Sequence, residues 1–263
     1  MKSLYIFVTS DRPDQYLNPI VHCILRGTNR IVFVQIEDSK TEKVQLNLLS
    51  ANVYDLINNL SLGFYKYYTG NQKDTLFALD TDYSSSELAR LKAQYIPCLT
   101  DNIKWSIERI NYLDLRKYIS SLHKKFGKNI IFDVTSVTKV YIGDILACCL
   151  LENVSELCTF ELLIIPDFSK PWKILIHNLE ESKQYRHLNL VETPIFKESA
   201  KAILIRTTPL LISIIGTAVF ITLTLIATFL LGNNSMIIQA ISTVGTALGI
   251  ISFILIYFPI RAN

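Results

Sequence analysis

Two short apolar stretches near the start of the chain, LYIFV (Leu4–Val8) and IVFVQI (residues 31–36), set the fold class. Both are rich in β-branched and aromatic residues, as strands buried on both faces are. Between them, Asn18 and Pro19 indicate the start of a helix that ends at Gly27. Strand, helix and strand within about 35 residues predict a parallel sheet covered by helices.

The middle of the chain repeats this alternation. NIIFDV (residues 129–134) is a further strongly apolar strand, followed by a predicted helix over 138–151 and a strand over 156–165. The segments 172–176 and 185–191 are predicted to form an antiparallel pair around a charged turn. The expected fold is therefore α/β: a Rossmann-like, mostly parallel sheet with an antiparallel edge, over residues 1–191.

The last quarter of the chain has a different character, because residues 207–260 contain no Asp, Glu, Lys, Arg or His. The polar break Gly232-Asn233-Asn234-Ser235 divides it into halves of about 24 residues, and about 20 helical residues cross a bilayer core. We predict a C-terminal transmembrane α-helical hairpin over 207–260, joined by a linker over 192–206. The alternative is a pair of buried helices in a large core.

Basic residues flank this apolar region and predict its orientation. Lys197, Lys201 and Arg206 precede it and Arg261 follows it, whereas the connecting turn has no charge. Because such residues stay on the cytoplasmic side, the expected location is the inner membrane, multi-pass, with the N-terminal domain and the C-terminus cytoplasmic.

Composition argues against several classes of protein. The 263 residues have a formal net charge of +3, which gives no reason to expect binding to duplex nucleic acid. The five cysteines form no C-x-x-C pair and the four histidines lie far apart, so no metal site is expected. The glycines allow neither a G-x-x-x-x-G-K loop nor a G-x-G-x-x-G fingerprint, so no nucleotide cofactor is expected.

Polar turns follow two of the predicted strands, where ligands bind in open α/β sheets. Thr9, Ser10, Asp11 and Arg12 follow the first strand. Thr135, Ser136, Val137, Thr138 and Lys139 follow Asp133 at the opening of a helix. Hydroxyls, a lysine and the free amides of a helix start attract anions, so the second turn resembles a phosphate cradle without glycines. The alternative is structural: Thr135 or Ser136 caps the helix, Asp133 binds nearby amides, and Lys139 is solvated.

The stretch DVTSVTK resembles the strand-four signature of CRISPR-associated Rossmann-fold (CARF) sensor domains, and the Thr9-Ser10-Asp11 turn lies where that family has its other ligand loop. The resemblance implies a homodimer, or a higher homo-oligomer, that binds a cyclic oligonucleotide and signals to an attached effector in antiviral defence. It implies that Thr135, Thr138 and Lys139 touch phosphate or base, and that Thr9 and Ser10 line the opposite wall. The chain departs from the pattern at Ser136 and Val137, where the family usually has glycines.

Small and polar residues recur on one face of each predicted span and are the candidates for membrane packing or a pore: Ser213, Thr217, Thr224, Gln239, Ser242, Gly245, Thr246 and Gly249. They either pack the hairpin against itself or line a shared interior. The expected function is thus a membrane effector that senses a cyclic nucleotide and permeabilises the inner membrane. The alternatives are a membrane-anchored enzyme that cleaves a nucleotide or RNA, including the bound signal, and an anchored scaffold.

Overall fold

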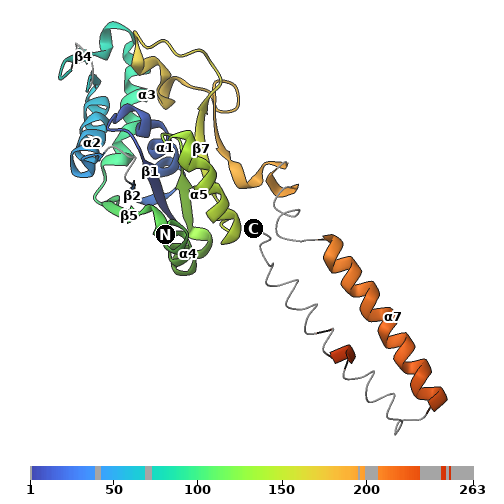
Figure 1. Cartoon of the computed structure of the whole chain (residues 1–263). Helices are drawn as coiled ribbons and strands as arrows, with labels where there is room; N and C mark the ends of the chain where they lie inside the picture. Colours follow the sequence, from blue (N-terminus) through green and yellow to red (C-terminus); the bar gives the residue numbers. More distant parts are fainter. Residues whose placement is uncertain are drawn as a thin grey trace. The chain divides into compact units, whose positions relative to one another are not determined.

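The computed structural model describes residues 2–38, 43–68, 73–194, 196–198, 207–231, 244–246 and 249. The chain divides into two compact units, Met1–Phe196 and Lys197–Asn263. The first unit contains a six-stranded sheet (Figure 1). Its strands are β1 (Lys2–Val8), β2 (Thr28–Glu37), β5 (Lys104–Asn111), β6 (Ile130–Asp133), β7 (Leu157–Leu162) and β8 (Tyr185–Asn189).

The strand order is β5-β2-β1-β6-β7-β8. Every neighbouring pair is parallel except β7 and β8, which are antiparallel at the edge. A short separate hairpin is formed by β3 (Phe64–Lys66) and β4 (Leu76–Ala78). The predicted mostly parallel sheet with an antiparallel edge is confirmed.

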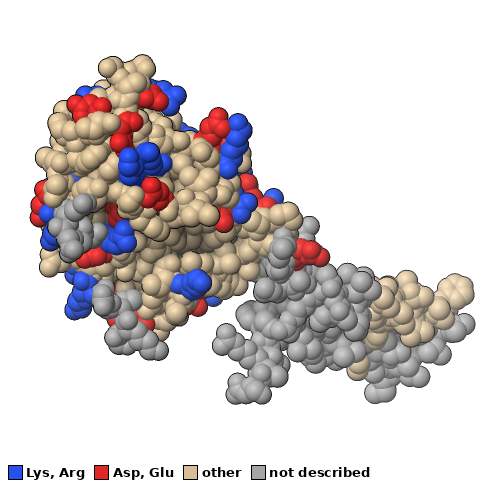
Figure 2. All heavy atoms as spheres, turned by 90° about the horizontal axis from the view of Figure 1, so that it is seen from above, with Lys and Arg blue, Asp and Glu red and all other residues tan. Residues whose placement is uncertain are grey.

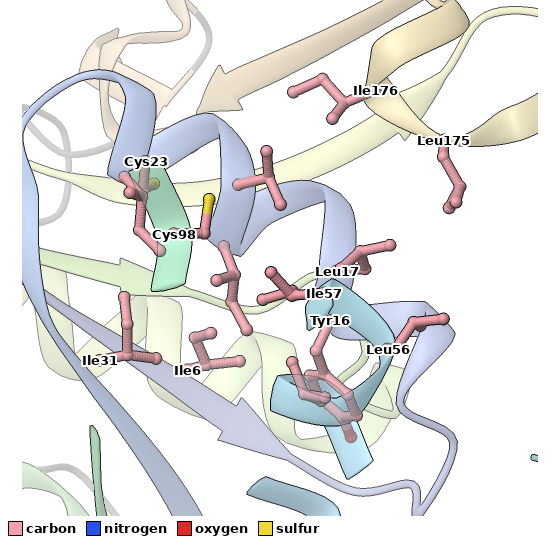
Figure 3. Close-up of a cluster of buried hydrophobic side chains, with 14 of the residues drawn as sticks. Ile6, Tyr16, Leu17, Cys23, Ile31, Leu56, Ile57, Cys98, Leu175 and Ile176 are labelled. Atoms are coloured by element: carbon pink, nitrogen blue, oxygen red, sulfur yellow. The ribbon is translucent and has the colours of Figure 1, made fainter. Parts of the chain in front are cut away.

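Helices cover both faces of the sheet. They are α1 (Asp14–Leu25), α2 (Leu46–Leu62), α3 (Ser85–Tyr95), α4 (Leu115–Phe126) and α5 (Lys139–Leu151). In β1, alternate residues face opposite ways: Ile6 packs with α1 and α2, and Phe7 packs with α4 and α5. Both faces are apolar because both are covered, which explains the continuous apolar run. Figure 3 shows Tyr16 of α1 and Ile57 of α2 in the first of these cores.

Two local predictions differ from the structure. Helix α1 begins at Asp14 after Pro13, and Pro19 lies inside it. Asn18 is not a cap: its side-chain amide donates to the Ile174 carbonyl at 3.0 Å, and its side-chain oxygen accepts from the Ile176 amide at 2.9 Å. The edge strand β8 pairs with β7 and not, as was predicted, with the segment 172–176. That segment lies in two short 3-10 helices, Pro171–Ile174 and Ile176–Asn178.

The C-terminal unit contains helix α7 (Thr207–Leu231). Across the part of the chain that the structure describes, no helix has both the length and the apolar character that a membrane crossing requires. This finding contradicts the predicted transmembrane hairpin and, with it, the predicted inner-membrane location. The prediction relied on the absence of charge, which marks a segment as apolar but does not by itself establish a continuous spanning helix. Most of the second predicted span, 235–258, lies outside the described residues.

Candidate functional site: the carboxyl edge between β1 and β6

The two polar turns predicted from the sequence follow adjacent strands. Ile6 of β1 pairs with Asp133 of β6, so both strands end at the same edge in the middle of the sheet. From β1 the chain proceeds outward to β2 and β5, and from β6 it proceeds the other way to β7. This is the reversal point of the strand order, where helices diverge to opposite faces and leave a crevice for a ligand.

The hydroxyl of Thr9 joins the two turns. It donates to the Ser136 carbonyl at 2.6 Å and accepts from the Thr138 amide at 3.2 Å. Thr9 and Thr138 are 129 residues apart in the chain. Thr9 therefore fixes the distance between the walls of the crevice, which leaves its hydroxyl engaged within the protein.

The remainder of the first turn is also held in place. Tyr16 donates its hydroxyl proton to the Ser10 carbonyl at 2.6 Å, and the Arg12 amide donates to the Ser10 hydroxyl at 3.3 Å. Arg12 extends outward and pairs with Asp14 at 2.7 Å, where it remains largely exposed. Asp11 is exposed. The turn is thus ordered, with its charged groups at the surface.

In the second turn, some side chains hydrogen-bond within the protein and others make no described side-chain bond. The Thr135 hydroxyl accepts from the Phe160 amide at 2.8 Å, so it links the turn to strand β7. Thr138 is the N-cap of α5 but makes no side-chain cap bond, and Lys139 begins the helix with an exposed side chain. The first amides of a helix have no partner within it. Thr138 and Lys139 are therefore the groups best placed to meet an anion.

An open hollow of about 670 Å³ lies over these turns. From the predicted residues it is lined by Thr9, Ser10, Arg12, Thr135, Ser136 and Thr138. A second hollow of about 640 Å³ shares Thr9 and Ser10 and includes Asp11, Lys43 and Lys73. Lys139 lies beside the first hollow and lines neither. Gln15 and Asn18 of α1 also line the first hollow and were not predicted, because they resemble ordinary helix residues in the sequence.

One face of the first unit has surface charges of both signs. On the face shown in Figure 2, basic and acidic side chains are interspersed over the first unit without a large patch of one sign. Where charges of both signs are mixed, long-range attraction of an anion is weak, and its binding depends on groups at short range, such as Lys139 and the amino end of α5.

A buried polar cluster behind the crevice was also missed. Asp133 is completely buried; its carboxylate accepts from the Thr135 amide at 2.9 Å and lies 3.2 Å from His187 Nε2 of β8. The ring of His187 lies 4.6 Å from that of His22, and burial lowers the pKa of His22 to about 3. Sequence patterns do not reveal this cluster because its members come from α1, β6 and β8. Asp133 has no exposed surface and is therefore not placed to react with a nucleotide.

The residues predicted to act within the hairpin fall partly in α7. Ser213, Thr217 and Thr224 belong to this helix, and the Thr224 hydroxyl donates to the Phe220 carbonyl of its own helix at 2.8 Å. The Phe220 ring lies so close to Gly245 that a Cβ at that position would collide with it. Gln239 and Ser242 lie outside the described residues, whereas Thr246 and Gly249 are described. Because the spanning hairpin is contradicted, the membrane-packing and pore roles of these eight positions are not retained.

The part of the chain that the structure describes contains no group of three or more His, Cys, Asp or Glu side chains that could hold a metal. No protein-family model matches the chain, and no curated protein matches it. Among solved structures, it matches Csm6 of Enterococcus italicus bound to cyclic hexa-2'-fluoro-hexa-dAMP, at 10% identity with a TM-score of 0.38. The match covers 99% of this chain and 59% of the Csm6 chain. A likeness of this size assigns no family.

Proposed function

We propose that this protein senses a cyclic oligonucleotide, which it binds at the carboxyl edge between β1 and β6. The observation on which this depends is the Thr9 bridge. It holds two polar turns together at the reversal point of the sheet, and among the described contacts the side chains of Thr138 and Lys139 form no hydrogen bond or ion pair. The phosphodiester of such a ligand is an anion, and it suits a helix start with a hydroxyl and a lysine.

The resemblance of DVTSVTK to CARF domains supports the choice of a cyclic ligand and of a homodimeric sensor acting in antiviral defence. The departures at Ser136 and Val137 have a structural basis. Val137 is 7% exposed and packs in the core under α5, and Ser136 offers its carbonyl to Thr9. The turn is therefore closed by side-chain packing and the Thr9 bond, without the need for glycine.

Isothermal titration of the full chain tests this proposal. The ligands are cyclic tetra- and hexaadenylate, cyclic dinucleotides and inorganic phosphate. Thr138→Ala and Lys139→Ala are expected to weaken binding of a cyclic oligonucleotide by on the order of tenfold or more, as loss of a hydrogen bond to a charged group does. Lys104→Ala is the matched control, because this exposed lysine begins β5 at the opposite edge of the sheet. Flat traces for every cyclic ligand, or equal affinity in Lys139→Ala and wild type, would refute the proposal.

A further inference from the structure

One edge of the six-stranded sheet is open. Strand β5 stands at the end of the strand order, and within the described part of the chain it pairs with β2 alone. Among the described residues, no backbone hydrogen bond from a turn or loop reaches the eight residues of β5. The amide and carbonyl groups on the outer side of such a strand can pair with another strand, so β5 can accept one.

The two faces of β5 differ in chemistry. Trp105 and Ile107 are half-buried and pack against the core under α1 and α2. The Trp105 ring meets the ring of Tyr54 of α2 edge to face, with 6.0 Å between the ring centroids. Lys104 and Glu108 lie on the opposite face, because side chains alternate along a strand. The edge therefore presents an apolar row on one face and charges of both signs on the other.

The carboxylate of Glu108 is held in place. It accepts from the hydroxyl of Tyr118 of α4 at 2.6 Å, and the guanidinium of Arg30 of β2 lies 3.7 Å away. The Glu108 side chain is 31% exposed, and Lys104 is exposed. Because Glu108 is already ordered, pairing with a cation on a neighbouring strand costs little further conformational entropy.

A second copy of β5 matches both faces at once. In an antiparallel pair centred on Ser106, Lys104 lies opposite Glu108 of the second copy, and Trp105 lies opposite its Ile107. Two-fold symmetry makes each pair occur twice. Opposite charges, and an aromatic with a β-branched side chain, are favourable cross-strand pairs. A pair centred on Glu108 would instead place two carboxylates opposite each other, so the sequence of β5 selects the register centred on Ser106.

We propose that two copies of this chain join edge to edge through β5, in antiparallel register centred on Ser106, and form one continuous sheet. Because the two strands run in opposite directions, the carboxyl edges of the two sheets point away from each other. The contact therefore does not bring the two candidate ligand sites together. It is independent of the proposed function and needs no ligand.

Cysteine cross-linking of the full chain, without ligand, tests the contact and its register. In the double variant Lys104→Cys/Glu108→Cys, each introduced thiol lies opposite one of the second copy, within reach of a disulfide. Mild oxidation is expected to give a covalent dimer on a non-reducing gel. The single variants Lys104→Cys and Glu108→Cys are the matched controls and should give none, because no introduced thiol then faces another. A bridge within one chain is excluded, since the two positions lie about 13 Å apart along the strand.

The variant Lys104→Glu tests the charge pairs by sedimentation equilibrium. The dissociation constant of the dimer is expected to rise on the order of tenfold, because both charge pairs become pairs of facing carboxylates. Lys128→Glu is the control: it makes the same change at an exposed residue before β6, in the middle of the sheet, and should leave the dissociation constant unchanged.

Two results overturn the inference: no covalent dimer in the double variant, or as much of it in the single variants. An unchanged dissociation constant in Lys104→Glu also overturns it. This variant alters only an exposed side chain, so it decides the question even if loss of the Tyr118 bond unfolds Glu108→Cys. Because no ligand is present, failure of the β5 contact leaves the proposed function standing.

Discussion

Acid should destabilise the first unit through His177, and the size of the effect follows from its surroundings. His177 is 8% exposed, lies 2.7 Å from the hydroxyl of Tyr95 through Nδ1, and has no described carboxylate partner. Burial lowers its pKa from 6.5 to about 3. The unfolded chain therefore binds a proton that the folded chain does not, so stability is greatest above pH 6.5 and falls as the pH drops from 6.5 towards 3. Between pH 7 and pH 5 the loss from His177 is about 2 kcal/mol.

The variant His177→Gln keeps a polar group at the site but cannot titrate. At pH 7 its free energy of unfolding is expected to be lower than that of wild type. Between pH 7 and pH 5, the free energy of unfolding of the variant should fall by about 2 kcal/mol less than that of wild type. Urea unfolding followed by tryptophan fluorescence measures this, because Trp105 and Trp172 both lie in the first unit. Leu175→Ala is the control: it removes a buried side chain of the same segment and should preserve the wild-type pH dependence. Equal pH dependence in wild type and His177→Gln would refute the reasoning.

Three further substitutions test contacts that stabilise the first unit. Asp133→Asn should lower the free energy of unfolding by about 1–3 kcal/mol, because an amide has one oxygen where the carboxylate uses two, one for the Thr135 amide and one for His187; urea titration at pH 7 would contradict this by showing no change. Ser84→Ala removes the N-cap hydroxyl of α3, which accepts from the Glu87 amide at 3.4 Å, and should cost about 1 kcal/mol by the same assay. Gly63→Ala should cost about 1–2 kcal/mol because Gly63 has φ +93°, and a melting temperature equal to that of wild type would exclude this strain.

The sheet could be predicted from the sequence because its signal is local. Leu4–Val8 falls within β1, and the run 31–36 falls within β2. Apolar, β-branched runs of this kind arise wherever both faces of a strand are covered, which is why the central strands were the clearest. The start of α1 was misplaced because Pro19 resembles a helix opening, although Pro13 occupies that position.

The candidate site was only partly predictable. The polar turns at Thr9 and Lys139 are visible as breaks after apolar runs, but the bond between Thr9 and Thr138 depends on strand order, which no single segment encodes. For the apolar C-terminal quarter the sequence suggested a feature that the structure contradicts, since an uncharged stretch was interpreted as a membrane span.

Asp133 serves two segments with one buried carboxylate: one oxygen holds the turn that opens α5, and the other holds His187 in the last strand before the chain leaves the sheet. A group with no exposed surface cannot exchange either partner for water without a large cost. A displacement of the turn therefore strains the contact with β8. A molecule bound at the turn would in this way act on the last strand before the chain continues to the C-terminal unit.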